Sequence, residues 1–273
     1  MAITAAMVKE LREMTGAGMM DCKKALNETN GNMDEAVEFL RKNGQAKAEK
    51  KASRIAAEGL CMVVTKDDQT AAVVEVNSET DFVAKNATFQ EFVKAVATQA
   101  VNSDAADMDA FMAEKWNEDA SKTVSEALVE KVAVIGENLK IRRFEKVVAE
   151  HGCVVPYVHG GGRIGVIVDA DTDVVNDTVK EAMHNIAMQI AALNPKYVSR
   201  DEVSADYIAH EKEILLAQIM NDPKESQKPE KVINGMIEGR ISKELKEVCL
   251  VDQVYVKAED GKQTVAQYLA QVA

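Results

Sequence analysis

Residues 70–86 have the sequence TAAVVEVNSETDFVAKN, and this stretch decides how the chain is expected to fold. Its first part, 70–77, is rich in valine and predicts a β-strand. The residues that follow, 87–101, place apolar side chains at helical spacing and predict a helix. The corner between them, TDFVAKN, therefore joins a strand to a helix, and it carries the aromatic ring of Phe82 among polar neighbours.

The position of Phe82 has two interpretations. Aromatic residues make up only 4% of the chain, so a ring at a polar corner is unusual. Such a ring either anchors the corner in the core or is presented to a partner. Composition alone favours the core position.

The composition is that of a soluble globular protein. The chain has 273 residues, of which 47% are hydrophobic and 29% charged, and this length allows two or three domains. With 33 basic and 45 acidic residues the net charge is −12, which argues against wrapping nucleic acid. Residues 1–56 are slightly basic while the remainder is strongly acidic, and this difference marks the first segment as a separate module.

Cysteine spacing and hydropathy predict a cytoplasmic protein. The four cysteines are far apart and form no CxxC pair, which is typical of reduced thiols: Cys22, Cys61, Cys153 and Cys249. The N-terminus is amphipathic and includes acidic residues, unlike a secretory signal. No apolar run approaches the roughly 18–20 residues that span a bilayer.

Residues 1–44 predict a small domain of three short helices separated by glycine. Asn32 is expected to cap the third helix, with Glu35 three residues further on, and Gly44 is expected to end it. Residues 45–59 contain few large apolar side chains and predict a solvated, partly helical linker.

Residues 60–103 predict a β-hairpin followed by a helix, and residues 153–195 repeat that plan. The copies align so that Thr80-Asp81 matches Thr172-Asp173. The predicted strands are 60–65, 70–77, 153–158 and 163–170. Each copy is expected to bury its helix against its sheet.

Between the copies, a helix at 123–135 and a strand at 139–148 complete the predicted core. The fold class is therefore α+β, with two related subdomains at 60–150 and 151–273.

The second subdomain contains a predicted helical insertion at about 200–246. Helical patterns at 203–220 and 230–245 predict an antiparallel hairpin of coiled-coil type. After it, 248–257 predicts a returning strand and 264–273 a final helix.

Motifs for catalysis or metal binding are absent from the sequence, which predicts no catalytic residues, no metal and no cofactor. HGGGR (159–163) suggests a phosphate cradle, but strands flank it on both sides, so a glycine hairpin turn is favoured. His159 and Arg163 remain candidates for surface contacts. Met19 and Met20 are adjacent and cannot both face one small core, so at least one is expected to be exposed. These features favour a binding protein over an enzyme.

Several motifs resemble the bacterial elongation factor Ts family. They are LREMTGAGMMDCKKALNETNGNMDEAVEFLRKNG (11–44), TDFVAKN (80–86), IGENLKIRR (135–143), HGGGRIGVIV (159–168) and NIAMQIAALNPKYV (185–198). They follow the family's order over nearly the whole chain. The resemblance implies a UBA-like N-terminal domain, a core of two related α+β subdomains and an inserted antiparallel coiled-coil hairpin.

The resemblance also implies a function. Family members are guanine-nucleotide exchange factors for elongation factor Tu: they disturb its magnesium and phosphate site so that GDP leaves and GTP rebinds during translation elongation. The implied partner is elongation factor Tu in its GDP-bound and nucleotide-free forms, without nucleic acid or membrane. The residues implied to displace the magnesium ion are Thr80, Asp81, Phe82, Val83, Ala84, Lys85 and Asn86. The residues implied to dock on the partner are Arg12, Met19, Met20, His159 and Arg163.

With the resemblance added, Phe82 is expected to be an exposed wedge. The second copy has Val174 at the matching position, so only the first copy carries a ring. The family's pattern continues beyond Ala273 with a strand and a helix, and Gln189 stands where relatives often have histidine. Contacts from those positions are not transferred to this chain.

Two other functions compete with nucleotide exchange. The helical hairpin also suits an interaction scaffold or chaperone-like adaptor, and the glycine turn suits a small-molecule α+β enzyme. A homodimer through the core or the helical hairpin stays open.

Overall fold

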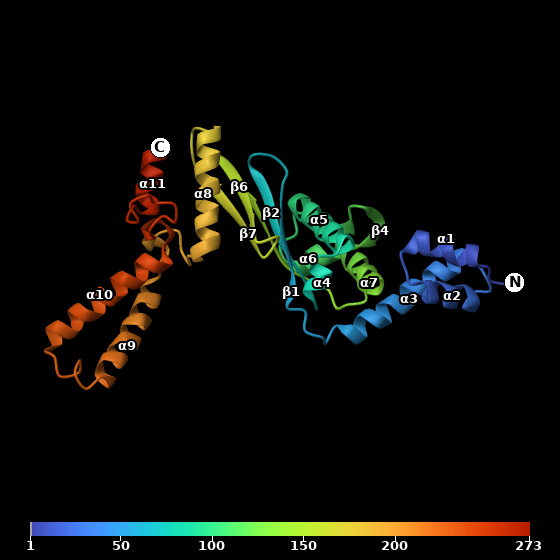
Figure 1. Ribbon diagram of the computed structural model, residues 1–273, viewed down its shortest axis with the longest axis horizontal. Helices are drawn as coiled ribbons and strands as arrows, with labels where there is room; N and C mark the ends of the chain where they lie inside the picture. The colour runs from blue at the N-terminus through green and yellow to red at the C-terminus, as the bar shows by residue number, and fades with distance from the viewer. Residues whose placement is uncertain (1) are drawn as a thin grey trace. The chain divides into compact units, whose positions relative to one another are not determined.

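The structure is a computed structural model that describes residues 2–273, and the chain divides into two compact units, residues 1–173 and 174–273 (Figure 1). Helices and small antiparallel sheets are both present, which confirms the predicted α+β class.

The first unit begins with the three predicted helices, α1 (Ala5–Thr15), α2 (Met19–Glu28) and α3 (Met33–Lys51). Asn32 caps α3 as expected, because its side chain accepts a hydrogen bond from the backbone N–H of Glu35. The helices enclose a small core whose buried members are Val8, Leu11, Cys22, Ala25, Leu26 and Ala36.

The prediction that Gly44 ends the third helix is wrong, because α3 continues to Lys51. Gly44 is buried, and a Cβ added there would lie 3.4 Å from the Cβ of Ala133 on helix α7 (Val124–Ile135). Glycine lets the two helices approach closely, so tertiary packing outweighs its low helix propensity. The first part of the predicted linker is therefore helical.

The central sheet has the order β1-β2-β5, with both pairs antiparallel. Its strands are β1 (Glu58–Thr65), β2 (Thr70–Ser78) and β5 (Lys140–Val148). Helix α5 (Ala87–Asn102) packs on β1 and β2 and buries its predicted apolar face, which comprises Phe89, Phe92, Val93, Val96 and Ala100. These strands and this helix confirm the sequence prediction.

Three short elements between α5 and α7 escaped prediction: α6 (Met108–Ala113), β3 (Lys115–Trp116) and β4 (Asp119–Thr123). They are too short to show a period, yet they add buried rings to the core. The ring centroids of Trp116 and Phe92 lie 5.9 Å apart.

The second predicted hairpin is present as β6 (Cys153–His159) and β7 (Ile164–Ala170), and it packs against β1 and β2. The backbone at Gly160, Gly161 and Gly162 has positive φ. HGGGR is therefore a hairpin turn, as the flanking strands indicated.

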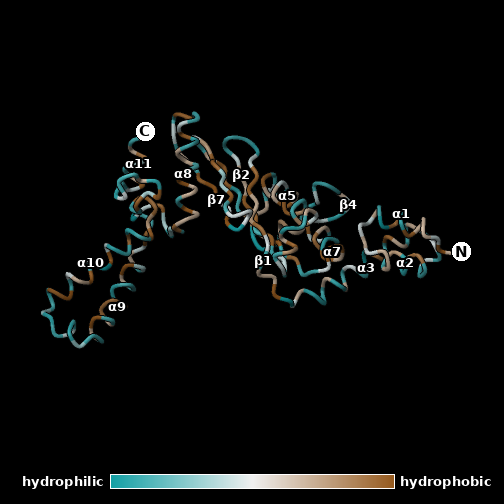
Figure 2. Tube along the Cα trace, viewed as in Figure 1, coloured by the Kyte–Doolittle hydropathy of each residue, from teal (hydrophilic) through white to brown (hydrophobic). Residues whose placement is uncertain are grey.

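The second unit is mainly helical, with α8 (Asp177–Leu193), α9 (Ala205–Asn221), α10 (Glu230–Val248) and α11 (Val265–Val272). Helices α9 and α10 form the predicted antiparallel hairpin, and Figure 2 shows apolar and polar residues alternating along both. Its buried stripe consists of Ile219, Ile233, Ile237, Ile241 and Leu245. Within residues 2–273, no helix has the length and apolar character needed to cross a membrane.

The predicted strand at 248–257 is wrong. The segment contains a 3₁₀ turn at Leu250–Asp252 and makes only isolated bridges among the described residues. The buried side chain of Gln189 donates to the carbonyl oxygen of Val254 (3.1 Å) and accepts from the N–H of Val256 (2.8 Å). A side-chain amide thus supplies partners that a neighbouring strand would otherwise provide.

Candidate functional site

The TDFVAKN corner consists of a single helical turn between two capping residues. Strand β2 ends at Ser78, and helix α4 (Asp81–Ala84) begins with Thr80 as its N-cap. The Thr80 hydroxyl oxygen accepts from the N–H of Val83, and the Asn86 side chain then caps α5. Thr and Asn favour caps because their short side chains reach backbone N–H groups that a helix leaves unpaired.

The turn points its side chains in opposite directions. Ala84 is buried and Val83 packs against the main core, whereas Phe82 is 81% exposed. The interpretation of Phe82 as a core anchor is therefore wrong. Asp81 and Lys85 form an ion pair of 2.7 Å, and the hydrogen bond from Lys85 lowers the pKa of Asp81 below its usual range.

Glu137 holds the start of this turn. One of its carboxylate oxygens, Oε2, accepts from the backbone N–H groups of Glu79 and Thr80, each at 3.1 Å. The other, Oε1, accepts from the Thr80 hydroxyl at 2.7 Å. Hydrogen bonds to an ionised group contribute roughly 1.5–3 kcal/mol each, and the partial exposure of Glu137 favours the lower end. We call these three bonds the Glu137 clamp.

The loop that carries Glu137 is tied to the end of α3. Asn138 donates its backbone N–H to the Glu79 carboxylate (2.6 Å) and its side-chain amide to the carbonyl oxygen of Arg54 (2.7 Å). The Lys51 ammonium group donates to the carbonyl oxygen of Gly136. The sequence pattern of IGENLKIRR assigns no role to its carboxylate or its amide. The sequence feature that could have indicated Glu137 is its place directly after Gly136, a glycine that follows a helix.

The HGGGR turn lies close enough to the corner for its charge to act there. Arg163 is exposed, and its positive charge contributes to lowering the pKa of Asp81. The backbone N–H of Cys61 on β1 donates to the carbonyl oxygen of Gly162 at 2.6 Å, which fixes the turn on the sheet. His159 is also exposed, and its Nδ1 lies 2.8 Å from the Tyr157 hydroxyl.

The other candidate docking residues lie on α1 and α2. Arg12 is exposed, and Met19 and Met20 are 59% and 74% exposed. The prediction that at least one methionine is exposed is confirmed for both. Met14, which is not among the predicted docking residues, is also exposed on α1. Figure 1 shows α1 and α2 at the end of the first unit, away from α4.

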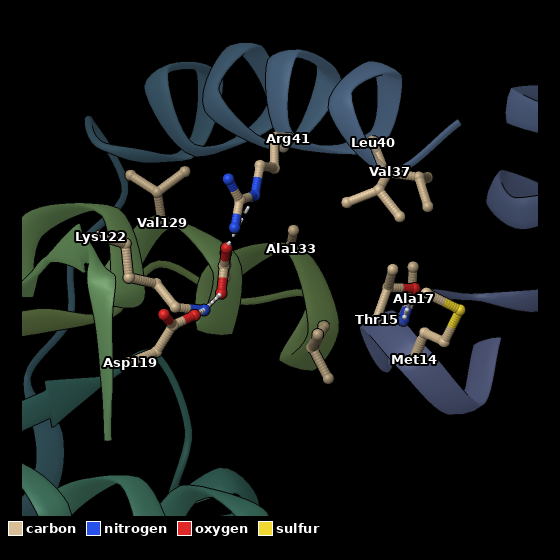
Figure 3. Close-up of a pocket in the computed structure, with 13 residues that line it drawn as sticks. Met14, Thr15, Ala17, Val37, Leu40, Arg41, Asp119, Lys122, Val129 and Ala133 are labelled. Atoms are coloured by element: carbon tan, nitrogen blue, oxygen red, sulfur yellow. Dashed lines mark hydrogen bonds and ion pairs between the residues drawn. The ribbon is translucent and has the colours of Figure 1, made fainter. Parts of the chain in front are cut away.

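A hollow of about 200 Å³ lies between α3, α7 and the end of α1 (Figure 3). Its apolar side includes Met14, Val37 and Leu40. Its polar side is a row of ion pairs: Arg41 with Glu130 (3.5 Å), Glu130 with Lys122 (2.5 Å), and Lys122 with Asp119 (3.2 Å). Because these charges pair with one another, the row joins the helical module to α7 and β4.

Among the described residues, 2–273, no group of three or more His, Cys, Asp or Glu side chains has the arrangement needed to hold a metal ion. None of the four cysteines forms a disulfide.

Comparison with known proteins places the chain among translation elongation factors. The family described as Elongation factor TS matches residues 79–273. Three similar relatives, each named Elongation factor Ts, come from Clostridioides difficile (54% identity; 99% of this chain and 87% of the relative), Clostridium novyi (50%; 94% and 83%) and Halothermothrix orenii (48%; 95% and 85%). The chain belongs to the elongation factor Ts family, as its motifs indicated.

Proposed function

We propose that the protein is a guanine-nucleotide exchange factor for elongation factor Tu, with Phe82 as the group that enters the GTPase. The observation that carries the proposal is the exposure of this ring on a turn fixed by two caps and the Glu137 clamp. An exposed phenylalanine on a rigid turn suits insertion into a partner, because little conformational freedom is lost on binding.

Nucleotide exchange requires that Mg²⁺ and GDP be displaced from the GTPase, and no covalent bond is broken. GDP binding to a GTPase depends on Mg²⁺ and on backbone N–H groups around the phosphates. Insertion of Asp81 and Phe82 beside that site shifts the elements that support the ion and weakens its contacts with the nucleotide. The remaining residues of the corner, from Thr80 to Asn86, hold the wedge in position. No side chain needs to act as an acid or a base.

Thermodynamic linkage sets the direction of the cycle. A factor that weakens GDP binding must itself bind the GDP form more weakly than the nucleotide-free form, by the same ratio. The proposed factor therefore stabilises nucleotide-free elongation factor Tu, and rebinding of GTP releases it.

Docking is assigned to two further surfaces. Arg12, Met19 and Met20 form the first, on the helical module, where methionine side chains adapt to an apolar partner surface. His159 and Arg163 form the second, beside the corner. The proposed domain division is 1–44 (helical), 45–59 (linker), 60–150 and 151–273 (α+β subdomains), with a helical insertion at about 200–246.

The test is the release of a fluorescent GDP from elongation factor Tu at fixed Mg²⁺, with and without this protein. We expect acceleration by orders of magnitude at saturating factor. When Mg²⁺ is removed by a chelator, the factor should accelerate GDP release only slightly further, because the ion that it displaces is already gone. An unchanged release rate in Mg²⁺ would reject the proposal and favour an interaction scaffold.

A further inference from the structure

Glu137 supports the corner from a distant part of the sequence. Its carboxylate accepts three hydrogen bonds from residues 57 and 58 positions earlier in the chain, Thr80 and Glu79. It is half-buried, and the bonds involve both of its oxygens. A carboxylate used in this way fixes the position of the backbone just before α4.

The Thr80 hydroxyl depends on Glu137 for its orientation. A hydroxyl group has one hydrogen to donate and lone pairs to accept with. Because that hydrogen is donated to Glu137, the lone pairs are left for the N–H of Val83, which is the bond that caps α4. Loss of the carboxylate frees the hydroxyl to rotate, and the cap weakens.

We propose that Glu137 is a positioning residue for nucleotide exchange, because it fixes the direction in which α4 presents Phe82. This inference rests on the proposed function and adds to it the residue that aims the ring. Phe82 is the second residue of a single helical turn, so a small rotation of the turn's first residues displaces the ring. A displacement of about 1 Å lowers rates by as much as about a hundredfold where alignment matters.

The loop that holds Glu137 is itself constrained from both sides. Helix α7 is followed by its C-cap, Gly136, where the backbone φ is 88°, a conformation that favours glycine. Lys51 binds the carbonyl oxygen of Gly136, and Asn138 bonds to Arg54 and Glu79. The carboxylate therefore starts from a fixed backbone, as a positioning group requires.

The first test is Glu137→Gln. An amide has one accepting oxygen and an NH₂ group that cannot accept, so either the backbone N–H groups or the hydroxyl hydrogen of Thr80 lose their acceptor. We expect the maximal rate of GDP release at saturating factor to fall about tenfold. Affinity for nucleotide-free elongation factor Tu, which the docking surfaces dominate, should change about threefold or less.

Glu126→Gln is the matched control. Glu126 accepts from the N–H of Thr123 (2.7 Å) in the capping box of α7, so it makes the same kind of bond away from the corner. Exchange should be unchanged in this variant. An equal loss in both variants would overturn the assignment to Glu137.

A double variant separates positioning from other roles. If Glu137 acts through the ring, Glu137→Gln should cause no further loss once Phe82→Ala is present. Losses that multiply would mean that Glu137 acts independently of Phe82, and the inference would then be wrong.

A measurement on this protein without elongation factor Tu tests the role of Glu137 independently of the proposed function. Amide hydrogen exchange at residues 79–85 should be about tenfold faster in Glu137→Gln and unchanged in Glu126→Gln. If that holds while the natural chain fails to release GDP, the exchange function is wrong and the geometry of the clamp stands. Unchanged protection at 79–85 contradicts the role of Glu137 whatever the release rate.

Discussion

The two hairpins that align in sequence, β1–β2 and β6–β7, are each followed by a Thr-Asp pair, but only the first pair continues directly into a helical turn. After Thr80-Asp81 the chain forms α4 at once. After Thr172-Asp173 it stays irregular until α8, which begins at Asp177 with Asn176 as its cap. The two corners therefore differ in structure although their sequences align.

The difference lies in the partners of the acidic groups. Asp81 pairs with Lys85 within its own turn, and the Glu137 clamp fixes the residues before it. Asp173 instead lies 3.2 Å from one ring nitrogen of His151, whose other nitrogen lies 2.7 Å from Asp171. The Thr-Asp pair therefore has a different structure in each copy, because different side chains from other parts of the sequence contact it.

The largest expected effect comes from Phe82→Ala. Removing the ring should lower GDP release from elongation factor Tu about a hundredfold, because a hot-spot side chain contributes roughly 2–3 kcal/mol. The thermal midpoint should hardly move, since the ring lies outside the core. Release kinetics and a thermal melt measure the two quantities.

Two control variants sharpen this result. Phe89→Ala, three residues into α5 and fully buried, should destabilise the fold by about 3–5 kcal/mol. Asp173→Ala, at the second corner, should leave exchange intact. A large loss of midpoint in Phe82→Ala, or an equal loss of exchange in Asp173→Ala, would contradict the distinction between the corners.

A smaller effect is expected from Thr80→Val, which keeps the shape of the side chain but removes the hydroxyl. The variant loses an N-cap worth about 1 kcal/mol and one bond of the clamp, so exchange should fall about fivefold. Thr80→Ser should restore most of the activity. No loss in Thr80→Val would show that the cap does not control the wedge.

The smallest effect is a difference in pH dependence between the corners. The hydrogen bond with Asp171 raises the pKa of His151 above 6.5, so the stabilisation it gives is present below that pH and is lost as the pH rises through the raised pKa. The lowered pKa of Asp81 means that its ion pair is lost only as the pH falls below 3.8.

As the pH rises from 6 through the raised pKa of His151, then, only the second corner should change. Amide exchange at residues 171–173 should speed up with pH beyond its intrinsic increase, and His151→Gln should remove that excess. Excess acceleration at residues 79–85 instead would contradict these assignments.

Much of the fold could be predicted because its signals are local. The valine-rich strands, the apolar face of α5 and the Asn32 cap each depend on neighbouring residues alone. Exposure of Phe82 was indicated by the family resemblance, against composition. The sequence therefore predicts where the corner lies, but it does not predict the structure of the corner.

The errors have long-range causes. Gly44 continues a helix because it meets Ala133, and the predicted strand at 248–257 is replaced because Gln189 supplies its backbone partners. Glu137 was overlooked because its bonds cross more than fifty residues of sequence. Hydrophobic periodicity and secondary-structure propensity depend on neighbouring residues, so they do not reveal such long-range contacts.

Because α3 is continuous, the number of residues between Gly44 and Lys51 sets both the distance along the helix and the angle around its axis at which α1 and α2 are held. A helix advances about 1.5 Å and turns about 100° with each residue. One residue inserted between Gly44 and Lys51 would swing the methionine surface of α1 and α2 about 100° around the helix axis, whereas four would return it to within about 40°. Natural length changes in this segment should therefore come in whole helical turns, or be accompanied by a break in the helix.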